Sequence, residues 1–582
     1  MRISVVRGSL VVLGVGLILA MVLALLLGST SGGSDARTDL AQSAPTTTVP
    51  PAPEPVEPSK AVELPARPNV VVVMADDMRV DDLAFAPNLR SLVAEQGVTF
   101  ENSFSPYPLC CPARASFLTG QYAHNHKVLW HDPPFGYGSF DDSRTLATSL
   151  QNAGYRTGFI GKYLNRYGLD RSKVTGEPSH SYVPNGWTDW RGAVENPGGA
   201  GFHGQTYDYF DTPFNVNGVI DNRYAGVYQS AVIGDFSVDM ARSFAGTADP
   251  FFMYVNYVAP HHGEPGEPDD PDGITHADGT PVRVPTPARP DWVKGRYDDL
   301  IDRPSGVART GEMVEYDVTD KPPSVQRRAR ALAEDALIAL RDATRQRAES
   351  IHVMDLHIAR LVKELKRSGE WDETVFAFTS DNGMIIGEHG LTMTKVRAYE
   401  PSLRVPLLIT GPGLREEQKR YDPVSTVDLA ATILDLADAD TPYPGDGVSR
   451  LDSLVTGDRG WTTPIVTEAL HTSDGGDDPA FRDRRSTIGI RVSQYSYTRY
   501  RDGTGELYDL VADPRQDQNV YASAEYAAVR AALDRLWTRV RSCRAASCVP
   551  SLPGRLAADA GQNEANTVAY WEEILGAYGW HD

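Results

Sequence analysis

Two short acidic stretches follow apolar runs in this sequence and supply the residue types that bind a hard divalent cation. Asp76-Asp77 comes just after the run Val70–Val73, and Asp381-Asn382 ends the stretch "TVFAFTSDN". Their side chains offer only oxygen ligands, the set that Ca²⁺ or Mg²⁺ prefers, and two adjacent carboxylates repel each other unless a cation holds them. Either pair alone is better explained as a turn or helix-cap signal. Both pairs together, each after an apolar strand, indicate a metal site.

Histidines follow a third apolar run and extend the same pattern. The run "PFFMYVNYVAP" leads directly into His261-His262. Ligands of open parallel sheets bind beyond the carboxyl ends of the strands, so three polar strand ends predict one site. A site role for His261 is favoured over an unremarkable loop histidine, whereas His262 and His389 are evenly balanced between the two. We assign His124 and His126 to structure or to the surroundings of the pocket.

The elements that must position these residues are strands and helices in alternation. Val70–Val73 is a β-branched run typical of a strand buried on both faces of a parallel sheet, and similar runs recur, including "VPLLITGPG" (405–413). Apolar residues between Ile351 and Leu365 recur on one helical face, and Gly369 is placed to end that helix. We therefore predict an α/β fold with a large mixed, mostly parallel sheet sandwiched by helices.

The pattern changes from about residue 456. The stretch "IGIRVSQYSYTRYRDGTGELYDLVADP" predicts short strands joined by a glycine-containing turn, and "SAEYAAVRAALDRLWTRVRS" predicts a helix after them. We interpret this part as a smaller C-terminal α+β subdomain containing an antiparallel sheet. Cys543 and Cys548 lie five residues apart here. In an exported protein the expected state is a small disulfide loop, with two free thiols as the alternative.

The charge of the chain excludes one large class of partner. Among 582 residues, 77 are acidic and 56 are lysine or arginine, a formal net charge of −21. A nucleic-acid-binding protein needs a basic footprint, so we expect no nucleic-acid partner. A polyanionic substrate would have to be met by local cations, because the field of the whole molecule repels it.

The N-terminal residues predict export. Arg2 and Arg7 precede Leu10–Leu27, an uncharged and apolar segment that fits either a cleaved signal peptide or a retained anchor. The basic residues place that end in the cytoplasm, so the remainder of the chain is expected to be extracellular or at the cell surface. The expected organisation is a signal peptide or anchor (1–28), a disordered linker rich in Pro, Thr and Ser (29–66), a catalytic domain (67–455) and a C-terminal subdomain (456–582).

Two adjacent cysteines, Cys110 and Cys111, stand in the stretch "PLCCPARASFLTGQY". The pattern Cys-x-Pro-x-Arg followed by "ASFLTG" resembles the signature of the type I, formylglycine-dependent sulfatases of the alkaline phosphatase-like superfamily. "MADDMR", "GFIGKYLNRYG", "APHHG", "TSDNG", "GEHGLTMTKVRAYE" and "GELYDLVADPRQDQN" extend the resemblance from about residue 67 to 540. The ordered series is much more specific than the cysteine motif alone.

The resemblance implies a role for each candidate residue. Cys110 would be oxidised to formylglycine by a maturation enzyme, with Cys111 as the variable residue after it. One Ca²⁺ ion would be bound by Asp76, Asp77, Asp381, Asn382 and the oxidised Cys110. Arg114 would brace the formylglycine. The sulfate contacts and the proton donor would come from Lys162, Lys395 and His261. Without the resemblance, both lysines would be read as ordinary surface residues.

These residue types suit sulfate ester hydrolysis. A hydrated aldehyde carries two hydroxyls, of which one attacks sulfur while the other later expels sulfate and restores the aldehyde. Metal coordination lowers the pKa of the attacking hydroxyl, lysines and Ca²⁺ stabilise the sulfuryl oxygens, and His261 or Lys395 protonates the leaving alcohol.

One departure from the family pattern bears on the substrate. Many sulfatases have a histidine two residues after the lysine equivalent to Lys162, where this chain has Leu164 and then Asn165. "GKYLN" with "CCPARASFLTG" resembles the branch that acts on 6-sulfated glucosamine, such as N-acetylglucosamine-6-sulfatase and the extracellular heparan sulfatases. We therefore expect a sulfuric ester hydrolase acting on a sulfated sugar. The alternatives are an arylsulfatase or choline sulfatase, a phosphonate or phosphate monoester hydrolase, and, least favoured, a non-enzymatic carbohydrate-binding protein.

Overall fold

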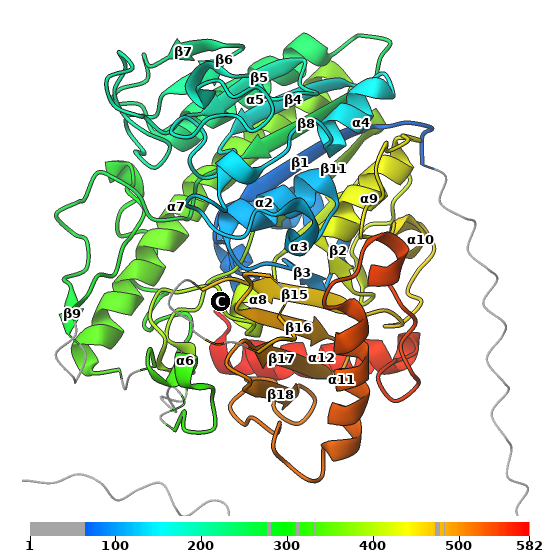
Figure 1. The fold of residues 1–582 in the computed structure, drawn as a ribbon. Helices are drawn as coiled ribbons and strands as arrows, with labels where there is room; N and C mark the ends of the chain where they lie inside the picture. The colour runs from blue at the N-terminus through cyan, green and yellow to red at the C-terminus, as the bar shows by residue number, and fades with distance from the viewer. Residues whose placement is uncertain are drawn as a thin grey trace, which may run out of the picture. The chain divides into compact units, whose positions relative to one another are not determined.

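The computed structural model describes residues 64–580 except 276–280, 310–314, 316, 330–331, 472–475, 477 and 482 (Figure 1). The predicted segment 1–28 and most of the linker 29–66 lie outside the described residues. Within the described part of the chain, no helix combines the length and the apolar character that crossing a membrane requires. The described residues belong to one compact unit, and the boundary proposed between residues 455 and 456 stays a prediction.

A ten-stranded mixed sheet forms the centre of the fold (Figure 1). Only two of its strands, β12 and β6, run opposite to β1, so the prediction of a mostly parallel sheet is confirmed. In spatial order the strands are β13 (Gln418–Arg420), β2 (Val98–Phe100), β12 (Leu407–Thr410), β11 (Thr374–Ser380), β1 (Asn69–Ala75), β8 (Phe251–Asn256), β4 (Arg156–Gly161), β5 (Asp189–Ala193), β6 (Phe214–Val216) and β7 (Val219–Asp221).

Strand β1 shows why the sequence of the central strands is almost wholly apolar. Val71 and Val73 contact a core on one face of the sheet, and Val70 and Val72 contact a core on the other. Side chains alternate between the two faces of a strand, so a strand covered on both sides has no polar face. β12 has the same composition although it is antiparallel, because burial on both faces does not depend on strand direction.

Helices cover both faces of this sheet. One core receives side chains from α5 (Gln229–Phe244) and α7 (Glu334–Ser368). The other receives them from α2 (Cys110–Thr119), α4 (Leu146–Asn152) and α9 (Thr426–Leu436). The sandwich of helices around the sheet is therefore as predicted.

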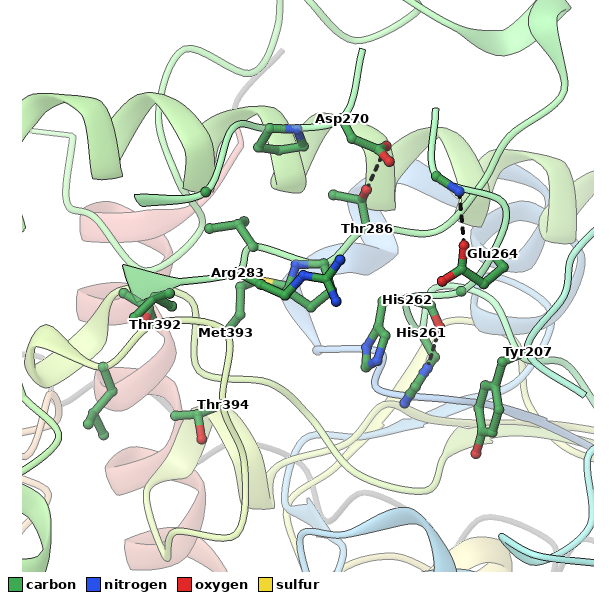
Figure 2. A pocket seen from close by; sticks show the side chains of 18 of the residues that line it. Tyr207, His261, His262, Glu264, Asp270, Arg283, Thr286, Thr392, Met393 and Thr394 are labelled. Atoms are coloured by element: carbon green, nitrogen blue, oxygen red, sulfur yellow. Dashed lines mark hydrogen bonds between the residues drawn. The ribbon is translucent and has the colours of Figure 1, made fainter. Parts of the chain in front are cut away.

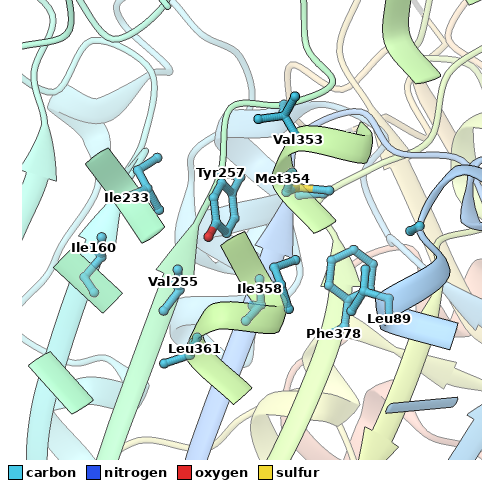
Figure 3. Packing of buried hydrophobic residues seen from close by; sticks show 14 of the residues in the cluster. Leu89, Ile160, Ile233, Val255, Tyr257, Val353, Met354, Ile358, Leu361 and Phe378 are labelled. Carbon is cyan, nitrogen blue, oxygen red and sulfur yellow. The ribbon is translucent and has the colours of Figure 1, made fainter. Parts of the chain in front are cut away.

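The predicted helix before Gly369 is the C-terminal half of α7. Figure 3 shows Met354, Ile358 and Leu361 of this helix packed beside Phe378 of β11 and Val255 of β8. Burying each such aliphatic side chain contributes about 1.5–3 kcal/mol to folding. Gly369 ends the helix with a left-handed φ of 81°, a conformation that glycine adopts without steric cost.

The C-terminal part contains the predicted antiparallel sheet. Four strands lie in sequence order, β15 (Ile465–Ala469), β16 (Thr487–Arg491), β17 (Tyr495–Tyr500) and β18 (Gly505–Asp509). Helix α11 (Ala527–Val540) packs its Leu533, Leu536 and Trp537 against them. Cys543 and Cys548 form the expected disulfide. A last helix, α12 (Ala560–Tyr578), was not predicted.

Candidate active site

The two acidic pairs meet because their strands are neighbours in register. Ala75 of β1 lies opposite Ser380 of β11 in a parallel pair, so Asp76-Asp77 and Asp381-Asn382 leave the sheet side by side. The backbone N–H of Asp77 donates to Asp381 Oδ1 at 3.1 Å, and Asn382 Nδ2 donates to Asp77 Oδ1 at 2.6 Å. Asp77 has a left-handed φ of 67°, which turns the chain at the strand end.

The oxygen atoms of this cluster fit a cation. Asp76 Oδ1, Asp77 Oδ2 and Asn382 Oδ1 are buried and have no hydrogen-bond partner among the described residues. Such atoms are costly to bury unless something binds them. Ligand atoms of Asp76, Asp77, Asp381 and Cys110 all lie within 4.8 Å of one another. An all-oxygen carboxylate and amide set of this kind suits Ca²⁺.

Electrostatics supports the same interpretation. Burial, and after it the negative charge of Asp76, raises the pKa of the Asp381 carboxyl to about 7. For Asp77, burial would raise the pKa, but Lys395 and His261 outweigh it and hold it at about 2. The carboxylates are therefore crowded in a dry site, and a bound cation would relieve the repulsion.

Cys110 is the first residue of α2 and faces this cluster. Its Sγ lies 3.8 Å from Asp77 Oδ1 and accepts a hydrogen bond from Lys395 Nζ at 2.8 Å. Burial raises the pKa of the Cys110 thiol well above its usual value, and Asp76 adds to the shift. Because the thiolate is the reactive form of cysteine, the unmodified residue is a poor nucleophile here. Cys111 packs in the hydrophobic core instead.

The segment that leads into α2 is held by backbone hydrogen bonds from residues much later in the chain. The backbone N–H of Val396 donates to the carbonyl of Pro108 at 3.0 Å, and that of Glu468 donates to the carbonyl of Pro106 at 2.9 Å. The side chain of Cys110 is fully buried. Its position therefore depends on residues from the loop before α8 (Glu400–Leu403) and from β15.

Arg114 lies one helical turn after Cys110 and ties three strand ends together. Its Nε donates to Asp381 Oδ2 at 2.8 Å. Its Nη1 donates to the carbonyl of Lys162 at 3.0 Å and to Asn256 Oδ1 at 2.8 Å. Residues at i and i+4 share a helix face, so Cys110 and Arg114 meet the sheet edge together.

Two lysines from distant parts of the chain form ion pairs with the two adjacent aspartates. Lys162, directly after β4, pairs with Asp76 Oδ2, while Lys395 pairs with Asp77 Oδ1. Each carboxylate thus uses one oxygen for a lysine, and within the described part of the chain its other oxygen accepts no hydrogen bond. Burial would lower the pKa of Lys395, but Asp77 and its neighbours raise it above the usual value. Both ammonium groups stay charged at neutral pH.

His261 completes the group of predicted residues. Its Nδ1 lies 2.7 Å from the carbonyl of His262 and its Nε2 lies 3.7 Å from Asp77 Oδ2. Since a carbonyl only accepts, Nδ1 carries the proton and Nε2 is the nitrogen that faces the cluster. The structure brings together all nine predicted site residues: Asp76, Asp77, Cys110, Arg114, Lys162, His261, Asp381, Asn382 and Lys395.

A cleft of about 1170 Å³ opens beside this group, and Figure 2 shows His261, His262 and Tyr207 on its wall. Three residues of the cleft that were not predicted as site residues are Tyr207, Asn165 and His131. The ring of Tyr207 lies 4.9 Å from that of His261 and 5.0 Å from Lys162 Nζ, and its hydroxyl accepts from Asn165 at 2.6 Å. His131 also lines the cleft. Of these three residues, only Asn165 belongs to a sequence motif that we had singled out, since it ends "GKYLN".

The contacts of the remaining histidines show which of them lies at the cleft and which have structural partners. His262 lines the cleft, whereas His389 Nδ1 lies 2.7 Å from Glu315 Oε2 and its ring packs on Tyr399. His124 pairs with Glu468 and donates to the carbonyl of Cys543, and His126 Nε2 bonds to Ser116 of α2. The last two are structural in their contacts.

Comparisons with known proteins identify relatives of the chain. A family model described as Sulfatase matches residues 68–439, and one described as N-sulphoglucosamine sulphohydrolase, C-terminal, matches residues 387–543. An extracellular sulfatase SULF-1 homolog of Drosophila melanogaster is 30% identical over 442 residues, which are 74% of this chain and 35% of that protein. The chain thus spans about a third of that relative.

Other relatives are covered over most of their length. An arylsulfatase of Volvox carteri is 30% identical over 525 residues, 83% of this chain and 76% of that protein. The human N-acetylglucosamine-6-sulfatase is 27% identical over 495 residues, 78% of this chain and 81% of that protein.

Solved structures share the fold. One, in complex with its substrate D-glucosamine-2-N,6-O-disulfate, has a TM-score of 0.58 and 23% identity, covering 81% of this chain and 96% of the other. A phosphonate monoester hydrolase from Silicibacter pomeroyi has a TM-score of 0.55 and 22% identity, covering 84% and 99%. At these identities the similarity establishes the fold alone.

Proposed function

The chain belongs to the sulfatase family and is a sulfate ester hydrolase, and we propose that it releases inorganic sulfate from a sulfated sugar of the N-acetylglucosamine-6-sulfate kind. We further propose that oxidised Cys110 is its nucleophile and that one Ca²⁺ ion is its metal. The observation that carries the mechanism is the position of Cys110. It is buried as an unreactive thiol beside the ammonium of Lys395 and beside the side chains of Asp76, Asp77 and Asn382, three of whose oxygens have no hydrogen-bond partner among the described residues.

A formylglycine at position 110 and a bound Ca²⁺ ion would supply the reactive hydroxyl and its activation. A hydrated formylglycine provides a hydroxyl nucleophile, and Ca²⁺ lowers the pKa of a hydroxyl beside it and polarises sulfate oxygens. Asp76, Asp77, Asp381 and Asn382 would hold the ion. The contact of Arg114 with Asp381 at 2.8 Å fixes one of these ligands and relates it to α2, which makes Arg114 a positioning residue.

Lys162 and Lys395 provide the positive charge for the sulfate group. Their ammonium groups lie against Asp76 and Asp77, on the carboxylate oxygens that are not free for a cation. Preorganised cations in a water-poor site stabilise negative charge on oxygen atoms far better than the same groups in water. We assign both lysines to binding the sulfate oxygens.

His261 is suited to exchange a proton with the leaving alcohol. Its Nδ1–H is held by the carbonyl of His262, and the carbonyl of His261 itself accepts from Tyr209 Oη at 2.6 Å. The ring is therefore fixed with Nε2 toward the site. With its proton on Nδ1, the neutral ring accepts a proton at Nε2, and it delivers one to the leaving alcohol only in its doubly protonated form. Lys395, which is cationic, is the other proton donor of the site.

The relatives support the choice of substrate. Two kinds of relative are named for hydrolysis of a sulfated sugar or an aryl sulfate, and one structure with the same fold contains a disulfated glucosamine. Phosphonate hydrolysis is the alternative that the shared fold leaves open. The non-enzymatic alternative, a carbohydrate-binding protein without activity, leaves unexplained the buried lysines and the oxygens that lack a hydrogen-bond partner in the part of the chain that the structure describes.

We also propose that the protein is exported and depends on a maturation enzyme. The Cys543–Cys548 disulfide supports export, since disulfides persist in oxidising compartments, and one relative is named as extracellular. Oxidation of Cys110 requires an enzyme that recognises the segment around it.

Parallel assays test the function. Sulfate release from N-acetylglucosamine-6-sulfate, an aryl sulfate and choline sulfate, and phenol release from a phenyl monoester of an alkylphosphonate, are measured on protein from a host that oxidises the cysteine. We expect the highest kcat/KM on the sugar, and background rates for Cys110→Ala. Turnover of the phosphonate above all sulfate esters would contradict the proposal.

A further inference from the structure

Tyr207 joins the two loops that carry Lys162 and His261. Asn165, three residues after Lys162, donates from its Nδ2 to the hydroxyl of Tyr207 at 2.6 Å. The backbone N–H of Glu264, three residues after His261, donates to the carbonyl of Tyr207 at 2.7 Å. One loop therefore holds the backbone of Tyr207, and the other holds the tip of its side chain.

The segment around Tyr207 is fixed against the loop that follows β8. The backbone N–H of Tyr209 donates to the carbonyl of Glu264 at 2.8 Å, and Asp208 pairs with Glu264 as an isolated parallel bridge. The hydroxyl of Tyr209 donates to the carbonyl of His261 at 2.6 Å. The ring of Tyr207 therefore has a defined place, although the residue lies outside the helices and strands.

This ring contacts the functional groups of both loops. Its centroid lies 5.0 Å from Lys162 Nζ and 4.9 Å from the ring of His261. The ring of His261 also stacks on that of His262 at 4.1 Å, and Figure 2 shows His261 between His262 and Tyr207. Because rings on two sides restrict its rotation, His261 keeps its Nε2 in the direction of Asp77, 3.7 Å away.

The ammonium of Lys162 has few other neighbours that could hold it. Among the described residues its only ion pair and hydrogen bond is with Asp76, and its side chain is 1% exposed. An ammonium carries three donors, and a cation within about 6 Å of an aromatic ring is attracted to the face of that ring. Tyr207 thus holds the charge in place through its ring and leaves N–H donors for the oxygens of a sulfate group.

We propose that Tyr207 is a positioning residue of the active site and that Asn165 orients it. The ring keeps the Lys162 ammonium beside Asp76 and keeps the His261 ring turned toward the site. This rests on the proposed function and adds two residues to its machinery. Because both residues act through others, their replacement should change kcat more than KM.

Two substitutions separate the ring of Tyr207 from its hydroxyl. On matured protein with N-acetylglucosamine-6-sulfate, we expect Tyr207→Leu to lower kcat about tenfold to hundredfold, as for misplaced reacting groups. KM should change less than about threefold, since the substrate contacts remain. Tyr207→Phe keeps the ring and should lose only about twofold to fivefold in kcat, as for one hydrogen bond.

Tyr224 offers a matched control. It is half-buried like Tyr207, its ring contacts Phe214 and Phe236, and its hydroxyl donates to Asp221 at 3.2 Å, but it lies outside the cleft. Tyr224→Leu should keep the native kcat. Thermal midpoints of all variants separate a loss of stability from a loss of catalysis.

A double-mutant cycle tests whether Asn165 acts through Tyr207. Asn165→Ala should lower kcat by about as much as Tyr207→Phe, because each change removes the same hydrogen bond. The double variant should then be no slower than either single variant. Losses that multiply would contradict the assignment of Asn165.

The leaving group tests whether the ring acts on His261 as well as on Lys162. A nitrophenolate leaves without protonation, whereas the alcohol of a sugar needs a proton donor. The loss of kcat in Tyr207→Leu should therefore be at least about threefold larger for the sugar sulfate than for nitrophenyl sulfate. Equal losses on the two esters would contradict the positioning of His261.

The outcomes distinguish this inference from the proposed function. A folded Tyr207→Leu protein with the native kcat would overturn the inference and leave the proposed function standing. If that variant does not fold, native kcat in both Tyr207→Phe and Asn165→Ala would overturn it instead. If the native, matured protein releases sulfate from no ester, the proposed function fails, and the inference fails with it.

Discussion

Lys395 Nζ donates a hydrogen bond to Cys110 Sγ at 2.8 Å, although 285 positions separate the two residues in the chain. The same ammonium also contacts Asp77 Oδ1. A cation that contacts both the candidate nucleophile and a candidate metal ligand marks the place where the oxygens of a sulfate group would be bound.

The mass of the peptide that carries Cys110 is the most direct test of the nucleophile. In active protein we expect residue 110 to have lost its sulfur, with an aldehyde oxygen in place of the thiol, while the adjacent Cys111 of the same peptide keeps its thiol. Cys110→Ala should lose sulfatase activity, and Cys111→Ser should retain it because Cys111 lies in the core. A full rate from protein with an unmodified Cys110 would refute this mechanism.

Removal of divalent cations should abolish activity, and Ca²⁺ should restore it. Added Ca²⁺ should also raise the thermal midpoint, because a ligand that binds only the folded state stabilises it. Asp77→Asn keeps the shape of the side chain but removes a charge, so the Ca²⁺-dependent rise should shrink. Asp249→Asn, an exposed change, is the control. Undiminished turnover in a chelator would rule out the metal site.

Replacement of Lys395 should affect catalysis more than folding. Its side chain is less enclosed than that of Lys162, with 12% against 1% exposed. We expect Lys395→Met to lower kcat by roughly 10²-fold or more, as for loss of one preorganised donor, with a small change in thermal midpoint. Lys162→Met should lose activity and stability together. A Lys395→Met enzyme with native kcat would exclude its role.

His126 should make stability fall in mild acid. Burial lowers its pKa to about 3, and both ring nitrogens are engaged, Nδ1 accepting from the backbone of Val128 at 3.1 Å. In the unfolded chain His126 binds a proton below about pH 6.5, whereas in the folded protein it stays neutral down to about pH 3. The contribution of neutral His126 to the free energy of unfolding is therefore fully present above pH 6.5 and is lost as the pH falls toward 3. The slope reaches about 1.4 kcal/mol per pH unit.

Denaturant unfolding at pH 5–8 measures this effect. His126→Gln should be less stable than the native protein at pH 8, because hydrogen bonds to α2 and Val128 are lost, and its stability should fall less between pH 6.5 and 5. Parallel curves for the two proteins would show that His126 does not contribute.

The predictable part of the site is the part that depends on local pattern. Asp76 and Asp381 stand at strand ends, and parallel neighbours bring such ends together. Cys110 and Arg114 share a helix face by their spacing. The ion pairs of Lys162 with Asp76 and of Lys395 with Asp77 were not predictable, because they join segments that are far apart in the chain.

The unpredicted part comes from irregular segments. Tyr207 and His131 lie outside the helices and strands, and no periodicity relates them to the site. The direction of β12 also could not be predicted from the sequence, because burial on both faces gives parallel and antiparallel strands the same composition.

The burial of Cys110 limits when, during synthesis and folding, its side chain can be reached. The segment before it is fixed by Val396 and Glu468, which are synthesised long after it. While the chain is incomplete, these contacts cannot form, so they cannot enclose the thiol. Once the chain has folded, the side chain is sealed. If Cys110 is oxidised as proposed, we expect the modifying enzyme to act on the growing or unfolded chain, and a molecule that folds before it is oxidised would stay inactive until it unfolds.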